Sequence, residues 1–258
     1  MTVALITGAS SGIGEATARR LVREPDMNLV LVARREDRLA ALTQELGGTY
    51  VAADLVADDA PQRIADHVRQ HHDGRLDLLV NNAGAAWRGE FGDVGYANVR
   101  KTMDLNFDAV VRLTEALLPM LRASAPSAMV NIGSSAGRVA RGGSASYSAS
   151  KFALSGWTDG LHLEERKHGV HVAQVLPGFI KTEGFPANEL PSWLPSTPDK
   201  VADAIVECWQ GKAERYVPRP YYIGALLRIA VPGLVRFVLG RGPAERLTTS
   251  TGADAAES

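Results

Sequence analysis

Short, almost entirely apolar segments alternate along this chain with longer segments that carry apolar residues at helical spacing. Strands that are apolar on both faces are typical of a parallel sheet covered by helices on each side. Strands that alternate with helices predict a doubly wound α/β fold with about seven strands. Six of the strands are expected at Val3–Thr7, Asn28–Ala33, Thr49–Ala53, Leu76–Val80, Ala128–Ile132 and His171–Leu176. The helices are expected at Gly12–Arg23, Glu36–Leu46, Ala60–His72, Tyr96–Leu121, Tyr147–His168 and from Thr197 to about Gln210.

Charge balance and cysteine usage narrow the class of protein. The 258 residues include 28 Lys and Arg against 29 Asp and Glu, so the formal net charge is -1. Binding to nucleic acid needs a concentrated basic surface, and no nucleic acid is therefore expected as a partner. The single cysteine, Cys208, cannot form a disulfide within the chain, and the first apolar run is too short for a signal peptide, so we expect a cytoplasmic protein. The sequence contains no cluster of Cys and His residues of the kind that binds metal ions, so no metal site is expected.

A glycine-rich turn follows the first predicted strand. Such a strand–turn–helix unit aims backbone N–H groups and the positive end of a helix at a phosphate, and glycine lets the backbone approach closely. The spacing Gly-x-x-x-Gly-x-Gly differs from the more common Gly-x-Gly-x-x-Gly, but its position at the first crossover of a Rossmann-type sheet still predicts a dinucleotide site. The residues of this site are Gly8, Ser10, Ser11, Gly12, Ile13 and Gly14.

Two arginines follow the second predicted strand, whose end should lie near the adenosine ribose. An acidic residue at that end would bind the ribose 2′-hydroxyl, but here the strand ends in Val32-Ala33 and continues with Arg34-Arg35. Guanidinium groups form charge-assisted hydrogen bonds with phosphate, which favours NADP(H) over NAD(H). We expect Arg34 to contact the 2′-phosphate, with Arg35 as the second candidate for this contact. Alternatively, one or both arginines are solvated on the next helix, where Glu36 or Asp37 could neutralise them.

Tyr147 and Lys151 lie four residues apart, so on a helix they share a face. An ammonium group near a phenol lowers the phenol's pKa toward the range useful for proton transfer. The pair alone is a weak signal. Ser134 strengthens it, because it follows a predicted strand at the edge where parallel sheets bind ligands, and its hydroxyl could hydrogen-bond a substrate oxygen. Ser135 is an adjacent alternative that spacing does not exclude.

Together these motifs resemble the short-chain dehydrogenases/reductases, in their compact single-domain branch. The resemblance runs in matching order from about Val3 to Val217, so we expect one catalytic domain over residues 1–217. It implies an adenine-binding pair at Asp54 and Leu55 and an active-site asparagine at Asn106. Further cofactor residues implied by the family are Asn82, Ala83, Gly84, Pro177, Gly178, Ile180 and Thr182.

The resemblance also implies roles. Tyr147 would be the general acid in reduction and the general base in oxidation. Lys151 would lower the pKa of Tyr147 and bind the nicotinamide ribose, while Ser134 would orient the substrate oxygen. Asn106 would hold a water that links Lys151 to solvent, although an asparagine within a helix could simply bond a neighbouring backbone group. The family usually forms homodimers or homotetramers, and we expect one of these.

The substrate side is less defined. The family's substrate loop corresponds here to about residues 183–197, and its prolines and aromatic residues suggest an apolar lid. The candidate substrate-lining residues are Trp87, Phe179, Phe185 and Trp193, beside Ser134 and Tyr147. Ordinary packing under loops explains any one of these aromatic residues equally well. Their combined apolar character favours a small hydrophobic alcohol, ketone or aldehyde as the substrate.

The C-terminal segment departs from the family pattern. Residues 218–246 form an apolar and basic extension, and its stretch from Pro218 to Gly242 has no acidic residue. A lid or a subunit contact is the first interpretation, attachment to a membrane surface the second, and a spanning helix the least favoured. The polar tail, residues 247–258, is expected to be disordered.

Three functions are compatible with these features. The leading one is an NADP(H)-dependent oxidoreductase that interconverts an alcohol and a carbonyl compound. The second is a non-catalytic NADP sensor, which would not need Ser134, Tyr147 and Lys151 together. The third is a membrane-surface-associated reductase of lipid or steroid type that uses the C-terminal segment.

Overall fold

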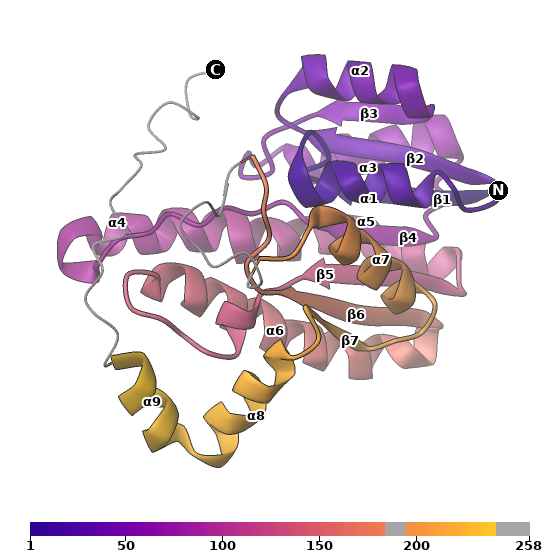
Figure 1. Ribbon diagram of the computed structural model, residues 1–258. Coiled ribbons are helices and arrows are strands. Elements are labelled where there is room, and N and C mark those ends of the chain that lie inside the picture. The colour runs from indigo at the N-terminus through magenta and orange to yellow at the C-terminus, as the bar shows by residue number, and fades with distance from the viewer. Residues whose placement is uncertain (184–194, 241–258) are drawn as a thin grey trace.

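The computed structural model describes residues 1–183 and 195–240 of the chain. Its described strands form a seven-stranded parallel sheet in the order β3-β2-β1-β4-β5-β6-β7 (Figure 1). The strands are β1 (Thr2–Thr7), β2 (Met27–Ala33), β3 (Thr49–Ala52), β4 (Leu78–Asn81), β5 (Ser127–Ile132), β6 (Val170–Pro177) and β7 (Glu214–Val217). The predicted Rossmann-type fold is confirmed.

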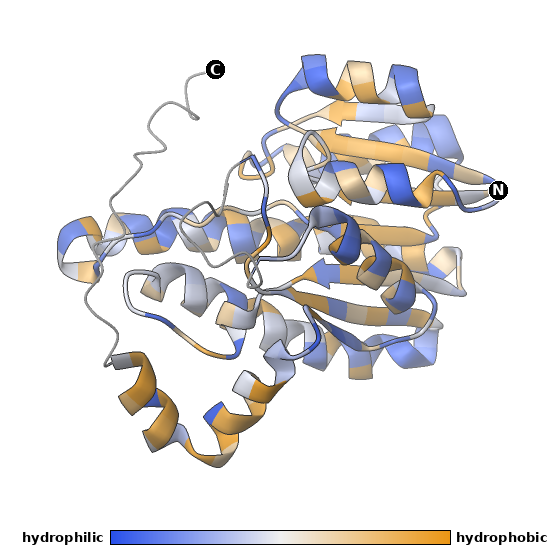
Figure 2. Ribbon diagram, in the orientation of Figure 1, coloured by the Kyte–Doolittle hydropathy of each residue, from blue (hydrophilic) through white to orange (hydrophobic). Residues whose placement is uncertain are grey.

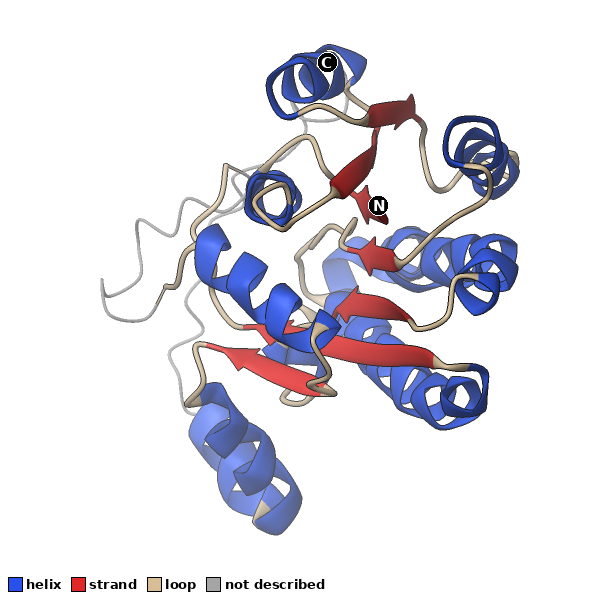
Figure 3. Ribbon diagram, turned by 90° about the vertical axis from the view of Figure 1, so that its right-hand side faces the viewer, coloured by secondary structure: helices blue, strands red, loops and turns tan. Residues whose placement is uncertain are grey.

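Helices cover both faces of this sheet (Figure 3). The crossover helices are α1 (Gly12–Leu21), α2 (Glu36–Leu46), α3 (Ala60–His72), α4 (Phe91–Met103), α5 (Ala109–Ala123), α6 (Ala145–Glu165) and α7 (Pro198–Trp209). One core cluster joins the sheet to α1, α2 and α7, and the other joins it to α3, α5 and α6. Because successive side chains of a strand point to opposite faces, Ala4 and Ile6 belong to the first cluster and Val3 and Leu5 to the second. This two-sided burial explains why the strands read as continuous apolar runs.

The strand order reverses between β1 and β4, which pair with each other at the middle of the sheet. In open parallel sheets, a crevice forms at the carboxyl ends of the strands at such a switch point. The segments that follow β1, β4, β5 and β6 therefore converge on one edge, and they carry most of the predicted site residues.

The helix predicted over Tyr96–Leu121 is not continuous. It consists of α4, with a kink at Gly95 (φ +60°), a π-helical segment η1 (Asp104–Asp108) and α5. A π-helix widens the turn by one residue and is frequent at functional sites. Here the interruption holds Asn106, which is fully buried.

Two further helices follow β7. They are α8 (Tyr221–Ala230) and α9 (Pro232–Gly240), and they extend away from the sheet in Figures 1 and 3. Both lie in the segment expected to be an apolar and basic extension, residues 218–246. The tail predicted to be disordered, residues 247–258, lies outside the described residues.

Candidate active site

The glycine-rich turn between β1 and α1 is packed too tightly for side chains at two of its glycines. Gly8 has φ +66°, which disfavours other residues, and a Cβ at Gly14 would lie 2.2 Å from the Gly8 carbonyl oxygen. The turn brings the backbone N–H groups at the start of α1 to the sheet edge. Ser11 precedes α1 without capping it through its side chain, and Ile13 packs against the core. These features form a cradle of backbone atoms, as a phosphate group requires.

The segment after β4 is fixed to this turn. The Asn82 amide donates a hydrogen bond to the Thr7 carbonyl oxygen at 2.8 Å, and the Thr7 hydroxyl accepts from the Ala83 backbone N–H at 3.0 Å. A Cβ at Gly8 would lie 2.9 Å from the Asn82 side-chain nitrogen. Two motifs that are some 75 residues apart in the sequence thus form one rigid unit.

Ser134, Tyr147 and Lys151 lie together beside this unit, as the sequence predicts. Ser134 follows β5, whereas Tyr147 and Lys151 lie on one face of α6. The Lys151 Nζ atom donates to the Ile132 carbonyl oxygen at 2.7 Å and lies 5.9 Å from the centre of the Tyr147 ring. A Cβ at Gly84 would lie 3.0 Å from the Asn106 Oδ1 atom, so a side chain there would crowd the Asn106 amide. Ser135, the alternative serine, begins the short 3-10 helix η2 (Ser135–Gly137).

Burial shifts both titratable groups of this trio toward their neutral forms. The Lys151 side chain is 5% exposed, and desolvation lowers its pKa from 10.5 to about 8. Burial raises the pKa of the Tyr147 phenol, while a hydrogen bond with Ser134 and the positive charge of Arg88 oppose the rise. Arg88 was missed in the sequence analysis, because nothing in its local pattern relates it to Tyr147. The site therefore contains a neutral phenol beside an ammonium group that loses its proton near pH 8.

Asn106 is held from both ends of its amide. Its Oδ1 accepts from the Ala85 N–H at 2.9 Å, and its Nδ2 donates to the Ala85 carbonyl oxygen at 2.9 Å and to the Ser150 hydroxyl at 3.1 Å. The side chain therefore joins the segment after β4 to α6. Ser150, which is fully buried next to Lys151, is a second residue that spacing alone did not reveal.

The segment from Pro177 to Thr182 closes the same edge. The Ser134 hydroxyl lies 3.4 Å from the Pro177 carbonyl oxygen, and Ile180 forms an isolated β-bridge with Ser196. The Thr182 methyl group lies against Gly12, where a Cβ would be 3.3 Å away. The segment thus reaches from the Ser134 hydroxyl to the glycine-rich turn.

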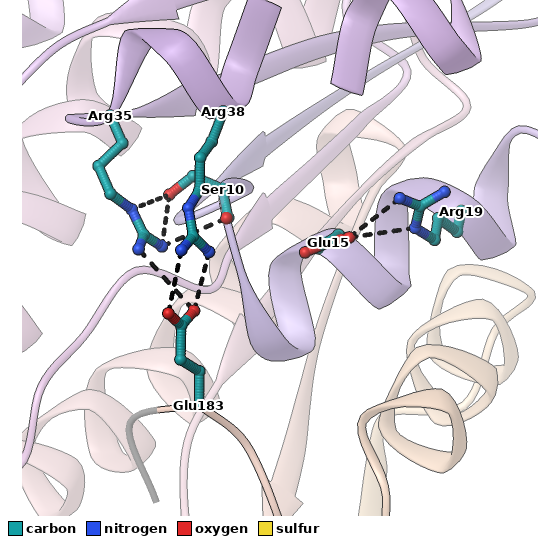
Figure 4. Close-up of polar contacts among 6 residues, drawn as sticks. All are labelled: Ser10, Glu15, Arg19, Arg35, Arg38 and Glu183. Atoms are coloured by element: carbon teal, nitrogen blue, oxygen red, sulfur yellow. Dashed lines mark hydrogen bonds and ion pairs between the residues drawn. The ribbon is translucent and has the colours of Figure 1, made fainter. Parts of the chain in front are cut away.

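Arg35 and Arg38 lie near the glycine-rich turn at the other end of the site (Figure 4). Arg35 donates to the Ser10 hydroxyl and carbonyl oxygens at 3.2 to 3.3 Å. Arg38 pairs with both oxygens of Glu183 at 2.9 and 3.0 Å, and Arg35 lies 3.8 Å from the same carboxylate. Arg34 is exposed and forms no hydrogen bond or ion pair within the described part of the chain. Arg38 and Glu183 were not among the predicted residues.

The remaining predicted residues lie around this edge. Asp54 is exposed and accepts from the Val56 N–H, while Leu55 is buried after β3. The Trp87 ring is covered by the Lys101 ammonium at 4.5 Å, and the Phe179 ring by the Arg141 guanidinium at 4.5 Å. Phe185 and Trp193 lie outside the described residues, as does most of the predicted substrate loop. Among the described residues, no group of His, Cys, Asp and Glu could hold a metal ion.

Comparisons with known proteins agree with this arrangement. A model of the short chain dehydrogenase family matches residues 2–190. The chain belongs to this family. Ketoacyl reductase HetN of Nostoc sp. is 32% identical over 222 residues, which cover 83% of this chain and 77% of that protein.

Two solved structures share the fold of this short-chain dehydrogenase. A variant of actinorhodin polyketide ketoreductase with NADPH has a TM-score of 0.76 and 27% identity, covering 84% of this chain and 95% of the other. A short-chain dehydrogenase from Burkholderia cenocepacia in complex with NADP has a TM-score of 0.81 and 25% identity, covering 92% and 97%. The protein is therefore an oxidoreductase of a family that uses nicotinamide cofactors.

Proposed function

We propose that this short-chain dehydrogenase is an NADP(H)-dependent enzyme that interconverts a secondary alcohol and a ketone, or an aldehyde and its alcohol. The observation that carries the proposal is the meeting of Ser134, Tyr147 and Lys151 beside the glycine-rich turn. A protein that only sensed the cofactor would need the turn but not a phenol, an ammonium group and a hydroxyl at this edge. The three groups together supply what proton exchange with a substrate oxygen requires.

The residues present fit the cofactor. The tight backbone at Gly8 and Gly14 suits a pyrophosphate, and Arg35 next to Ser10 suits a 2′-phosphate on the neighbouring ribose. Arg34 and Arg38 add positive charge at the same end. When bound, NADPH supplies the hydride for reduction and NADP+ accepts it in oxidation. The two solved relatives that contain NADPH or NADP support this choice of cofactor.

Tyr147 would exchange the proton. In reduction its O–H donates a proton to the carbonyl oxygen as the carbon receives a hydride, and in oxidation the phenolate takes the proton back. The Ser134 hydroxyl, which already bonds with the phenol, would hold the same substrate oxygen. Lys151, as an ammonium group below about pH 8, would stabilise the phenolate formed by proton donation.

Asn106 would position neighbouring residues of the site. Its amide fixes Ala85 to Ser150, and these residues adjoin Gly84 and Lys151. The water-holding role implied by the family stays a prediction for this chain. For the substrate, we propose a small hydrophobic carbonyl compound, since the aromatic residues Trp87 and Phe179 closely follow Gly84 and Gly178 in the sequence. The ketoreductase names of HetN and the actinorhodin enzyme support a ketone.

An NADPH-oxidation screen over ketones and aldehydes graded in size and polarity tests the proposal. We expect turnover with at least one apolar ketone, and faster turnover with NADPH than with NADH. Cofactor binding is measured in parallel by fluorescence titration. Tight NADPH binding with no turnover across the panel would contradict the proposal and favour a sensor.

A further inference from the structure

Exposed apolar side chains concentrate on α8 and α9. Among the described residues, ten of the sixteen large hydrophobic side chains that are exposed lie between Tyr222 and Leu239. Figure 2 shows hydrophobic residues along most of both helices. We name this the α8–α9 surface; it consists of Tyr222, Ile223, Leu226, Leu227, Ile229, Val231, Leu234, Phe237, Val238 and Leu239. A continuous apolar surface of this kind marks contact with something other than water.

The protein's own core does not use this surface. Ala225 is the only buried residue of α8, and no residue of α9 is buried. Arg228 lies one turn from Ala225 and is half-buried, so it belongs to the inner face of α8. The outer face of α8 is therefore entirely apolar, and Ile229 on it is 80% exposed. Short helices gain most of their stability from packing, so an apolar face this exposed indicates a contact surface.

The charge of the segment identifies the chemistry of that partner. Residues 218–240 contain Arg219, Arg228 and Arg236 and no acidic residue, although the whole chain has a net charge of -1. Arg228 lies on the inner face of α8, but Arg236 is exposed, and Arg219 is 76% exposed although it lies 3.7 Å from the Glu207 carboxylate. Arginine side chains can extend their guanidinium groups to lipid headgroups while their stems stay beside apolar side chains. A surface that is both apolar and positively charged matches a bilayer that contains anionic lipids.

A second copy of the chain matches less well. In a two-fold contact, the α8–α9 surface would face itself and bring the exposed Arg236 side chains of both copies together, with no acidic residue from either segment. Like charges that meet across an interface oppose association. Anionic headgroups neutralise the same arginines instead.

The dimensions of the two helices favour lying on a membrane. No single helix among the described residues is long and apolar enough to span a bilayer. Together α8 and α9 reach the required length and composition, but they are bent by 118° at the break between them. Two apolar helices of ten and nine residues with such a bend can lie flat in the interface, each with its apolar side toward the acyl chains.

The start of α8 connects this surface to the candidate active site. The Tyr221 ring packs on Gly178, where a Cβ would lie 2.6 Å from the ring. Gly178 belongs to the segment that contacts Ser134 through Pro177. A membrane under the α8–α9 surface would therefore lie close to the segment that borders the candidate active site.

We propose that the α8–α9 surface docks in the plane of a bilayer containing anionic lipids, and that the enzyme takes an apolar carbonyl compound dissolved in that bilayer. The substrate half of this inference rests on the proposed function. The docking half does not, because it follows from exposure, charge and helix geometry alone.

Flotation of the full-length protein with lipid vesicles tests the docking. Vesicles of phosphatidylcholine mixed with phosphatidylglycerol should bind the protein at least about tenfold more strongly than phosphatidylcholine alone, because each arginine near an anionic surface strengthens binding about fivefold. Ile229→Glu should lower the binding about tenfold. Val231→Glu and Val56→Glu form a matched pair, since the two valines are 40% and 39% exposed; only the first should weaken binding.

Each result decides the proposal. Absence of binding to either vesicle overturns it, as does equal binding by wild type and Ile229→Glu. A change of oligomer size on Ile229→Glu, measured by light scattering, would show that a second copy covers the surface, which also overturns it. Reduction of a water-soluble ketone should be the same for Ile229→Glu and wild type. If the wild type binds vesicles but reduces no carbonyl compound, the proposed function fails and the docking stands.

Discussion

The two ends of the candidate site are built in opposite ways. At the catalytic end, Ser134 and Lys151 are buried at 6% and 5% exposure, and each contacts main-chain atoms of the sheet edge. The other end lies beside the glycine-rich turn, where we propose that the cofactor phosphates bind, and we call it the phosphate end. There Arg38 of α2 and Glu183, which follows Thr182, are exposed and pair with each other. Figure 4 shows the guanidinium groups of Arg35 and Arg38 beside the Glu183 carboxylate.

Because the catalytic end is buried, it should be sensitive to substitution. Removing a group there leaves its partners unsatisfied in a dry environment, and charged forms are disfavoured. Solvent screens the charges at the phosphate end, so each contributes less and can exchange partners. Substitutions at the catalytic end should therefore have large effects on rate and stability, and those at the phosphate end should mainly change cofactor preference.

Tyr147→Phe should have the largest effect. It removes the proposed proton donor while keeping the ring, so kcat for carbonyl reduction should fall by about 10² to 10⁴. NADPH affinity should stay within about twofold, because the phenylalanine ring fills the same space. Single-turnover kinetics and fluorescence titration measure the two quantities. Tyr50→Phe, on the far edge of the sheet in β3, is the control and should keep wild-type turnover. Near-normal turnover by Tyr147→Phe would remove the acid–base role.

Lys151 should couple stability to pH without bound cofactor. Its pKa is about 8 in the folded protein and 10.5 when unfolded, so the unfolded state binds more protons between these values. The free energy of unfolding contributed by this group should therefore rise with pH, by on the order of 3 kcal/mol from pH 8 to 10.5. The difference between wild type and Lys151→Met in urea unfolding measures it. Cys208, whose burial raises its pKa to about 12, acts in the opposite direction but equally in both proteins. A constant difference across this range would mean that Lys151 is protonated and solvated in the fold.

Arg35→Ala should change cofactor preference rather than catalysis. Loss of a charge-assisted contact to phosphate should weaken NADPH binding by about 10- to 100-fold. NADH lacks this phosphate, and its binding should change by less than about threefold. Arg34→Ala is the matched variant; its exposed side chain predicts a smaller loss. Equal losses for NADPH and NADH in Arg35→Ala would indicate that Arg35 only shapes the turn at Ser10.

The sequence predicted the catalytic end better than the phosphate end, for a physical reason. Residues of the buried end follow strands with unambiguous apolar patterns, and β1 and β5 begin one residue from their predicted starts. Ser134, Tyr147 and Lys151 are positioned by those elements. The family resemblance supplied Asn106, but no periodic signal indicates the π-helix in which it lies, because the apolar spacing of α4 continues into α5.

Contacts between exposed side chains lack such a signal. Arg38 and Glu183 are 145 residues apart, and neither belongs to an apolar pattern that fixes its position. Arg38 lies one helical turn beyond Arg34 and Arg35, which could have marked it as part of the same basic group. Glu183 follows the Thr182 that ends the family motif, but nothing in its spacing relates it to α2.

Glu183→Gln should have the smallest effect of these substitutions, and it should strengthen NADPH binding, whereas Arg35→Ala should weaken it. The Glu183 carboxylate pairs with Arg38 and lies near Arg35, and the Arg38 guanidinium lowers its pKa, so it stays ionised at neutral pH. An anion already between these arginines competes with the phosphate of NADPH for the same donors. Removing its charge should strengthen NADPH binding by about two- to fivefold, leave NADH binding unchanged, and lose this effect in high salt. Glu45→Gln is the matched control, since its side chain is 55% exposed against 56% for Glu183 and pairs with Arg19 instead. Weaker NADPH binding by Glu183→Gln would show that the carboxylate holds the arginines in position, and the exposed end would then be as preorganised as the buried one.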